Sequence, residues 1–128
     1  MTNADLIIFC IDDDFAYQRY IDHSLGTRYD VRGINSGEEC LERTQTEIVD
    51  LVLIVAPLKN MSASEVCEDI KNDPLLKKVP VIYLSEIDSQ SDRDYAYQSG
   101  ADDYIEKHST PNDIKLMVDV ALEIIPTA

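Results

Sequence analysis

Short apolar runs alternate with amphipathic stretches along the chain, and this alternation constrains the fold more than any other feature of the sequence. Residues 6–11, 51–56 and 79–84 form runs that are almost continuously apolar and rich in β-branched side chains. Such runs are typical of strands buried on both faces of a parallel sheet. Residues 29–34 and 103–106 are shorter and more mixed, and we predict two further strands there.

Helix-capping patterns mark the stretches between these runs. Ser62 and Glu65 form a capping box, which predicts a helix running to about Lys71. Thr110, followed by Pro111 at the first helical position, predicts a last helix that reaches about residue 125. Three more helices are predicted at residues 15–25, after the cap Ser36, and at residues 90–99.

Repeated alternation of strand and helix predicts an α/β fold. The expected architecture is a five-stranded parallel sheet, doubly wound in (βα)5 order, which gives a flavodoxin-like three-layer sandwich. We find no internal repeat or linker, so residues 1–128 are predicted to form a single domain. In such a sheet, ligands gather at the carboxyl ends of the strands.

The net charge limits the expected binding partners, and the cysteines indicate the cellular compartment. The chain has 25 acidic and 11 basic residues, a net charge of -14, which disfavours nucleic acid and membrane surfaces as direct partners. The start lacks a basic segment, and no apolar run is long enough to span a membrane. Cys10, Cys40 and Cys67 lack metal or redox spacing and are expected to be buried in a reducing cytoplasm.

Polar residues gather where the predicted strands end. Asp12, Asp13 and Asp14 follow the first strand, Ser85 follows the fourth and Lys107 the fifth. Carboxylates, a hydroxyl and an ammonium at one edge suit a divalent cation and a phosphoryl group. The acidic triplet also fits a solvated loop that opens a helix, because negative charge favours a helix N-terminus.

The order of these motifs resembles the receiver domains of bacterial two-component response regulators over nearly the whole chain. The matching segments are IDDD at 11–14, VDLVLI at 49–54, EVCEDIKNDP at 65–74, VPVIYLS at 79–85 and GADDYIEK at 100–107. The resemblance implies an acidic pair at the first strand, a phosphate-contacting hydroxyl at Ser85, a switch aromatic at Tyr104 and a lysine at Lys107.

The departures from the family pattern concern the phosphoryl acceptor itself. Where the resemblance places the acceptor aspartate, this chain has Val55. Asp50 lies five residues upstream, roughly 16 Å away along a strand, so it cannot substitute. The family's Mg²⁺ is held by the acidic pair, the acceptor and a backbone carbonyl, here that of Pro57. Without the acceptor we expect Mg²⁺ binding to be weak or absent, and no other cofactor.

Two more positions depart from the family pattern. Glu86 replaces a small residue and repels phosphate, and His108 replaces a proline after Lys107, so a trans peptide bond is expected there. Lys107 is then predicted to form an ion pair with Asp12, Asp13 or Glu86. We interpret His108 and His23 as ordinary surface residues.

The last helix is apolar nearly all round, which predicts a protein-contact surface. Placed at 100° intervals, one set of residues faces the sheet, namely Ile114, Val118, Ala121, Leu122 and Ile125, with Met117 on the flank and a charged strip of Lys115, Asp119 and Glu123. The predicted interface on the fourth helix, fifth strand and fifth helix comprises Tyr95, Tyr97, Leu116, Val120 and Ile124. Scattered surface hydrophobic residues are the alternative.

The sequence therefore predicts a cytoplasmic pseudo-receiver in phosphorelay signal transduction that acts by phosphorylation-independent contact with a protein: itself, as a homodimer, an output domain or a kinase. A receiver taken from a larger regulator or hybrid kinase is a second possibility. A phosphatase of the haloacid-dehalogenase type is the third, because Asp12 and Asp14 match its Asp-x-Asp spacing, with Ser85 and Lys107 as later motifs. Its last acidic motif is missing, so we expect no enzyme.

Overall fold

The sheet and helices follow one another in strict alternation. The structure is a computed structural model that describes residues 5–59, 61–87 and 89–123 of the 128-residue chain. Its elements are β1 (Ile7–Ile11), α1 (Phe15–Leu25), β2 (Asp30–Ile34), α2 (Gly37–Arg43), β3 (Leu51–Ala56), α3 (Ala63–Asn72), β4 (Val81–Ser85), α4 (Gln90–Gln98), β5 (Asp103–Glu106) and α5 (Pro111–Ala121).

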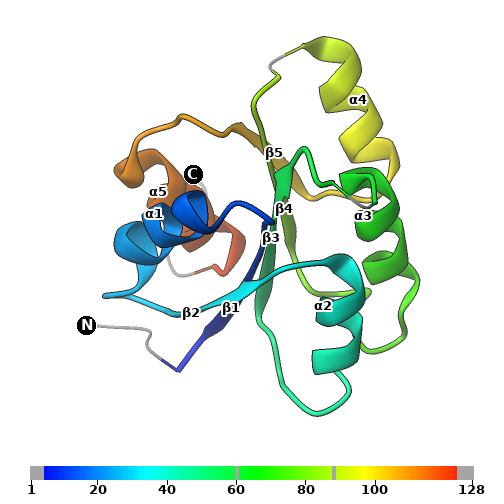
Figure 1. The fold of residues 1–128 in the computed structure, drawn as a ribbon, viewed down its shortest axis with the longest axis horizontal. Coiled ribbons are helices and arrows are strands. Elements are labelled where there is room, and N and C mark those ends of the chain that lie inside the picture. The colour runs from blue at the N-terminus through cyan, green and yellow to red at the C-terminus, as the bar shows by residue number, and fades with distance from the viewer. Residues whose placement is uncertain (1–4, 60, 88, 124–128) are drawn as a thin grey trace.

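All strand pairs are parallel, and the strand order is β2-β1-β3-β4-β5. Helices α1 and α5 cover one face of the sheet, while α2, α3 and α4 cover the other (Figure 1). The predicted doubly wound α/β fold is therefore confirmed. No helix in the described ranges has the length and apolarity needed to cross a membrane.

Two apolar clusters hold the helices against the sheet. Ile8 and Phe9 are neighbours in β1, and because successive strand residues point to opposite faces, they belong to different clusters. Phe9 packs on the side of α2, α3 and α4, and Ile8 on the side of α1 and α5. The three cysteines are free thiols buried in these clusters, as expected.

Two of the differences between the predicted and the observed strand boundaries have clear local reasons. Strand β4 begins at Val81 rather than at Val79, because Pro80 has no N–H to donate to the sheet; only its carbonyl takes part, accepting from Val52 N at 3.0 Å. Strand β2 begins one residue after Tyr29, whose N–H turns back to the carbonyl of Leu25 at the end of α1.

The last helix corrects two predictions. It ends at Ala121 rather than near residue 125, and Glu123 has a positive φ of 60°. Asp119 belongs to the charged strip predicted for this helix, but it is buried, at 2% exposed. Its Oδ1 accepts from Arg28 Nε at 2.9 Å and from the Tyr29 hydroxyl. The spacing of residues within α5 cannot show that the segment after α1 covers Asp119.

The inward face of the same helix agrees with its predicted pattern. Ile114 and Val118 are buried, and Ala121 and Leu122 pack partly buried against the same cluster. Ile125 lies outside the described residues.

Candidate functional site

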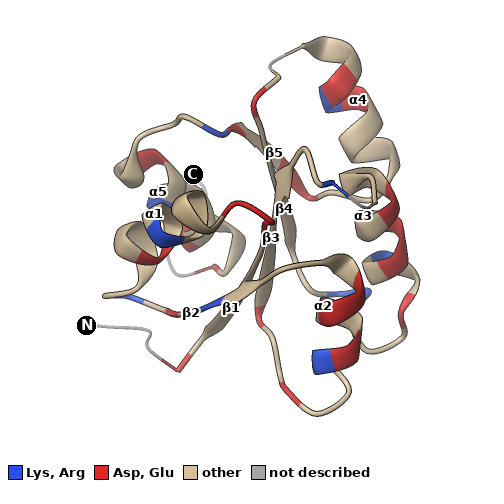
Figure 2. Cartoon of the chain, viewed as in Figure 1, with Lys and Arg blue, Asp and Glu red and all other residues tan. Residues whose placement is uncertain are grey.

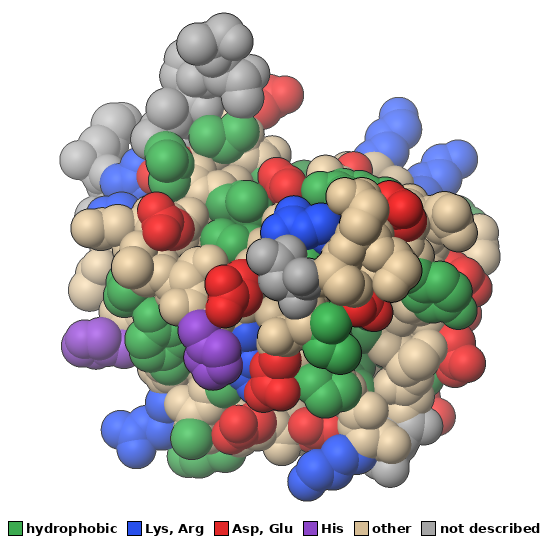
Figure 3. Space-filling view, turned by 90° about the horizontal axis from the view of Figure 1, so that it is seen from above, with side chains coloured by type: hydrophobic (Ala, Val, Ile, Leu, Met, Phe, Trp, Pro, Cys, Tyr) green, Lys and Arg blue, Asp and Glu red, His purple; other side chains and the backbone are tan. Residues whose placement is uncertain are grey.

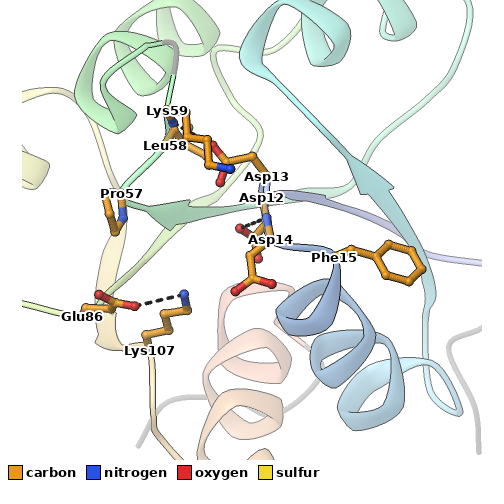
Figure 4. A pocket seen from close by; sticks show the side chains of 9 residues that line it. All are labelled: Asp12, Asp13, Asp14, Phe15, Pro57, Leu58, Lys59, Glu86 and Lys107. Atoms are coloured by element: carbon orange, nitrogen blue, oxygen red, sulfur yellow. Dashed lines mark hydrogen bonds and ion pairs between the residues drawn. The ribbon is translucent and has the colours of Figure 1, made fainter.

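A pocket with a volume of about 420 Å³ lies at the carboxyl ends of the strands (Figure 4). Seen over this edge of the sheet, acidic side chains gather beside a few cations and a histidine (Figure 3). The lining residues come from the ends of β1, β3, β4 and β5 and the start of α1: Asp12, Asp13, Asp14, Phe15, Pro57, Leu58, Lys59, Glu86 and Lys107.

Each acid of the triplet accepts a backbone hydrogen bond. Asp12 Oδ1 accepts from Asp14 N at 2.9 Å, and Asp13 Oδ2 accepts from Lys59 N at 2.7 Å in the loop after β3. Asp14 is the N-cap of α1, and its Oδ1 accepts from Ala16 N at 3.0 Å. Asp14 thus acts as the helix-opening interpretation predicts. Asp12 accepts a bond within its own loop, and Asp13 joins that loop to the loop after β3.

Asp12 is the most constrained of the three acids. It is 1% exposed, and its Oδ2 is buried without a hydrogen-bond partner. Burial raises the pKa of this carboxyl to about 6, and the neighbouring charges of Asp14 and Asp13 add to the effect, although the hydrogen bond from Asp14 N and the charge of Lys107 oppose it. The charged form of Asp12 therefore lowers the stability of the folded chain.

Lys107 pairs with Glu86, one of its three expected partners. Its Nζ lies 3.3 Å from Glu86 Oε1 and 4.6 Å from the centre of the Tyr17 ring. The Lys107 side chain is 9% exposed against 51% for Glu86, so the pair lies at the rim of the pocket. The amine is thereby held to Glu86 and to an aromatic face, and it makes no hydrogen bond to Asp12 Oδ2.

Two tyrosines of α1 hold the loop after β5. The Tyr17 hydroxyl donates to the carbonyl of Lys107, and the Tyr20 hydroxyl donates to that of Ser109 at 3.2 Å. The Lys107–His108 peptide bond is trans, and His108 is exposed. His23, on α1, is exposed as well. Nothing in the sequence motifs pointed to this tyrosine clamp, which depends on contacts between distant segments.

Val55 lies where the receiver pattern has an acceptor. It is 0% exposed and belongs to the apolar cluster under α1 and α5. Asp50 precedes the first residue of β3, and its Oδ2 accepts from Ile7 N at 2.8 Å, which fixes the start of β1. Strand β3 therefore brings no carboxylate to the pocket, because its nearest acid is engaged at the opposite end.

Ser85 and Tyr104 line a second hollow, of about 330 Å³, rather than the acidic pocket. Ser85 Oγ accepts from Ile87 N at 3.1 Å. Tyr104 is 3% exposed, its hydroxyl donates to the carbonyl of Ile87, and the Arg93 guanidinium lies 4.9 Å from its ring centre. The aromatic ring is therefore held inward under the loop between β4 and α4.

The predicted interface residues differ in exposure. Tyr95, Tyr97 and Leu116 are 60%, 45% and 51% exposed. Val120 is half-buried, and Ile124 lies outside the described residues.

Acidic residues mark α2, α3, α4 and the end of β1 (Figure 2). Within the described ranges, no three His, Cys, Asp or Glu side chains are grouped so as to hold a metal ion.

Comparisons with known proteins agree with this architecture. The family model of the response regulator receiver domain matches residues 8–119. The chain is 28% identical over 116 residues to the alkaline phosphatase synthesis transcriptional regulatory protein PhoP of Bacillus subtilis (strain 168), covering 90% of this chain and 48% of that protein. It is 33% identical over 109 residues to the heme response regulator HssR of Staphylococcus aureus (strain bovine RF122 / ET3-1), covering 84% of this chain and 46% of that protein.

A solved structure shows the same fold. The crystal structure of a putative response regulator from Chloroflexus aurantiacus J-10-fl superposes with a TM-score of 0.87 at 25% identity, covering 92% of this chain and 98% of that one. The chain spans about half the length of the curated relatives it matches.

Proposed function

Because the chain belongs to the response regulator receiver domain family of two-component signalling, we propose that it is a pseudo-receiver, which signals by protein contact without accepting a phosphoryl group. The observation that carries this proposal is Val55. An alkyl side chain has no nucleophile, and this one is completely buried in an apolar cluster. Asp50 gives no substitute, because it binds Ile7 N at the other end of β3.

The acidic residues do not fit the Mg²⁺ that the family pattern implies. Mg²⁺ demands near-octahedral oxygen geometry, and the side chain of Val55 supplies no oxygen. Asp13 and Asp14 are engaged with backbone N–H groups, and no metal-ligand group of three is present among the described residues. We therefore derive no step through a metal ion, and propose that Mg²⁺ binding is weak or absent.

The contact surface in this proposal is formed by α4, β5 and α5. Exposed Tyr95 and Tyr97 extend from α4, and Leu116 from α5. Tyr97 donates to Asp103 Oδ1 at 3.3 Å, which links α4 to β5. With Tyr104 held inward by Ile87 and Arg93, this surface stays in one state. The partner in this proposal is a second copy of the chain in a homodimer, an output domain of a larger regulator, or a kinase.

Incubation with acetyl phosphate and Mg²⁺, followed by intact mass measurement, tests the proposal. We expect an unchanged mass, while a receiver that carries the acceptor aspartate gains a phosphoryl group in the same buffer. A single phosphoryl adduct on this chain would overturn the proposal. Assay with an aryl phosphate tests the phosphatase alternative, and we expect no hydrolysis, since Asp14 serves as the cap of α1.

A further inference from the structure

The loop between β4 and α4 is held at three consecutive residues by the end of β5. The carbonyl of Ser85 accepts from Lys107 N at 2.8 Å, and Glu86 Oε1 lies 3.3 Å from Lys107 Nζ (Figure 4). The carbonyl of Ile87 accepts from the hydroxyl of Tyr104. Two of these contacts depend on side chains, so a substitution can remove either of them without changing the sheet itself.

Lys107 also joins this loop to the opposite face of the sheet. Its carbonyl accepts from the hydroxyl of Tyr17 on α1, and its Nζ lies 4.6 Å from the centre of the same ring. Helix α1 covers one face of the sheet and α4 covers the other (Figure 1). Contacts therefore lead from α1 through the backbone and side chain of Lys107 to Glu86, in the loop that precedes α4.

The same loop forms a wall of the hollow beside the proposed contact surface. Ser85 and Ile87 line this hollow together with Tyr95 and Tyr104. Tyr95 is 60% exposed and belongs to the contact surface, whereas Tyr104 is 3% exposed. The side chain of Ile87 is 57% exposed and adds little apolar packing, so the position of the loop depends on its polar contacts with β5.

We propose that the Glu86–Lys107 ion pair is a latch that keeps this loop closed over Tyr104 and so fixes the shape of the contact surface. With the pair formed, the Tyr104 ring stays inward and the hollow beside Tyr95 keeps its shape. When the pair is broken, the loop detaches more often, Tyr104 loses the Ile87 carbonyl, and the ring gains a second, outward orientation. This inference rests on the proposed function, because the surface that the latch controls is the one proposed to bind a partner.

Relaxation dispersion of the ¹³C-labelled tyrosine rings tests the latch, because it measures the population of a minor orientation on the microsecond to millisecond timescale. The Tyr104 signal is identified as the one that is lost in Tyr104→Phe. Glu86→Gln keeps the size of the side chain but removes its charge. We expect it to raise the minor population of Tyr104 about fivefold, the upper end of what a partly exposed ion pair contributes.

The matched control is Glu106→Gln, which removes an exposed charge one residue before Lys107 and should leave the Tyr104 signal unchanged. Two further arms separate an electrostatic latch from general loosening. Sodium chloride at about 1 M screens the ion pair, so it should raise the minor population in the unsubstituted chain and leave that of Glu86→Gln nearly unchanged. Tyr17→Phe removes the hydroxyl that binds the Lys107 carbonyl and should act in the same direction as Glu86→Gln.

Three results would each overturn the inference. They are an unchanged Tyr104 signal in Glu86→Gln or Tyr17→Phe, an equal effect of Glu106→Gln, and an equal response to salt with and without the Glu86 charge. If the latch fails in this way while acetyl phosphate leaves the mass unchanged, the pseudo-receiver proposal stands. If a phosphoryl adduct forms while Glu86→Gln releases the Tyr104 ring, the latch stands and the pseudo-receiver proposal is wrong.

Discussion

Replacing Asp12 by asparagine is expected to stabilise the folded chain at neutral pH. Burial raises the pKa of this carboxyl from 3.8 to about 6. Since one pKa unit corresponds to about 1.4 kcal/mol, the charged form costs up to ~3 kcal/mol of unfolding free energy. Water in the adjoining pocket screens the charge, so we expect Asp12→Asn to gain ~1–3 kcal/mol. Its amide still accepts from Asp14 N through Oδ1, as the carboxylate does.

The raised pKa of Asp12 also predicts how the stability gain of Asp12→Asn changes with pH. A carboxyl with a raised pKa binds its proton more tightly in the folded state, so the cost is present above about pH 6 and disappears as the pH falls toward 4. Urea denaturation near pH 7.5 and near pH 4 measures both limits. Asp13→Asn is the control, because Asp13 already binds Lys59 N and should change stability little at either pH.

Two outcomes would refute the reasoning on Asp12. The first is a less stable Asp12→Asn at neutral pH, which would mean that the carboxylate has a favourable partner. The second is a stability advantage of Asp12→Asn that grows rather than fades on acidification, because that is the behaviour of a carboxyl whose pKa is lowered in the folded state.

Three other perturbations give separate tests of the packing described above. Val55→Asp places a carboxylate in an apolar cluster and should lower the unfolding free energy by roughly 3 kcal/mol or more; a wild-type urea midpoint would contradict this. Asp119→Ala removes the acceptor of the buried Tyr29 hydroxyl and should cost ~1–3 kcal/mol by the same assay, whereas no loss would show that the contact contributes nothing. The three cysteines are buried and should react with a thiol reagent only after unfolding; rapid reaction of the native chain would be the contrary result.

The fold was predictable because its signals are local. Apolar runs, capping residues and the alternation of the two periodicities lie within short segments, and they located all ten elements. The errors arose where a neighbour or a single missing donor decides the outcome. Pro80 removes an N–H from the start of β4, and Asp119 is bound by Arg28 and Tyr29, which lie in the turn after α1.

The site was predictable in its residues but not in their contacts. The strand ends indicated that Asp12, Asp13 and Lys107 lie together, since parallel strands end at one edge. The bonds from Asp13 to Lys59 and from Asp50 to Ile7 join residues 46 and 43 positions apart. No spacing rule gives such pairs, because they depend on which segments the tertiary fold brings side by side.

The most direct test of the central claim is the intact mass of the chain with Val55 and of Val55→Asp after incubation with acetyl phosphate and Mg²⁺. The account predicts that the chain with Val55 keeps its mass at every time point, because no carboxylate of β3 faces the pocket. A phosphoryl adduct on the chain with Val55, whatever the variant does, would contradict the account.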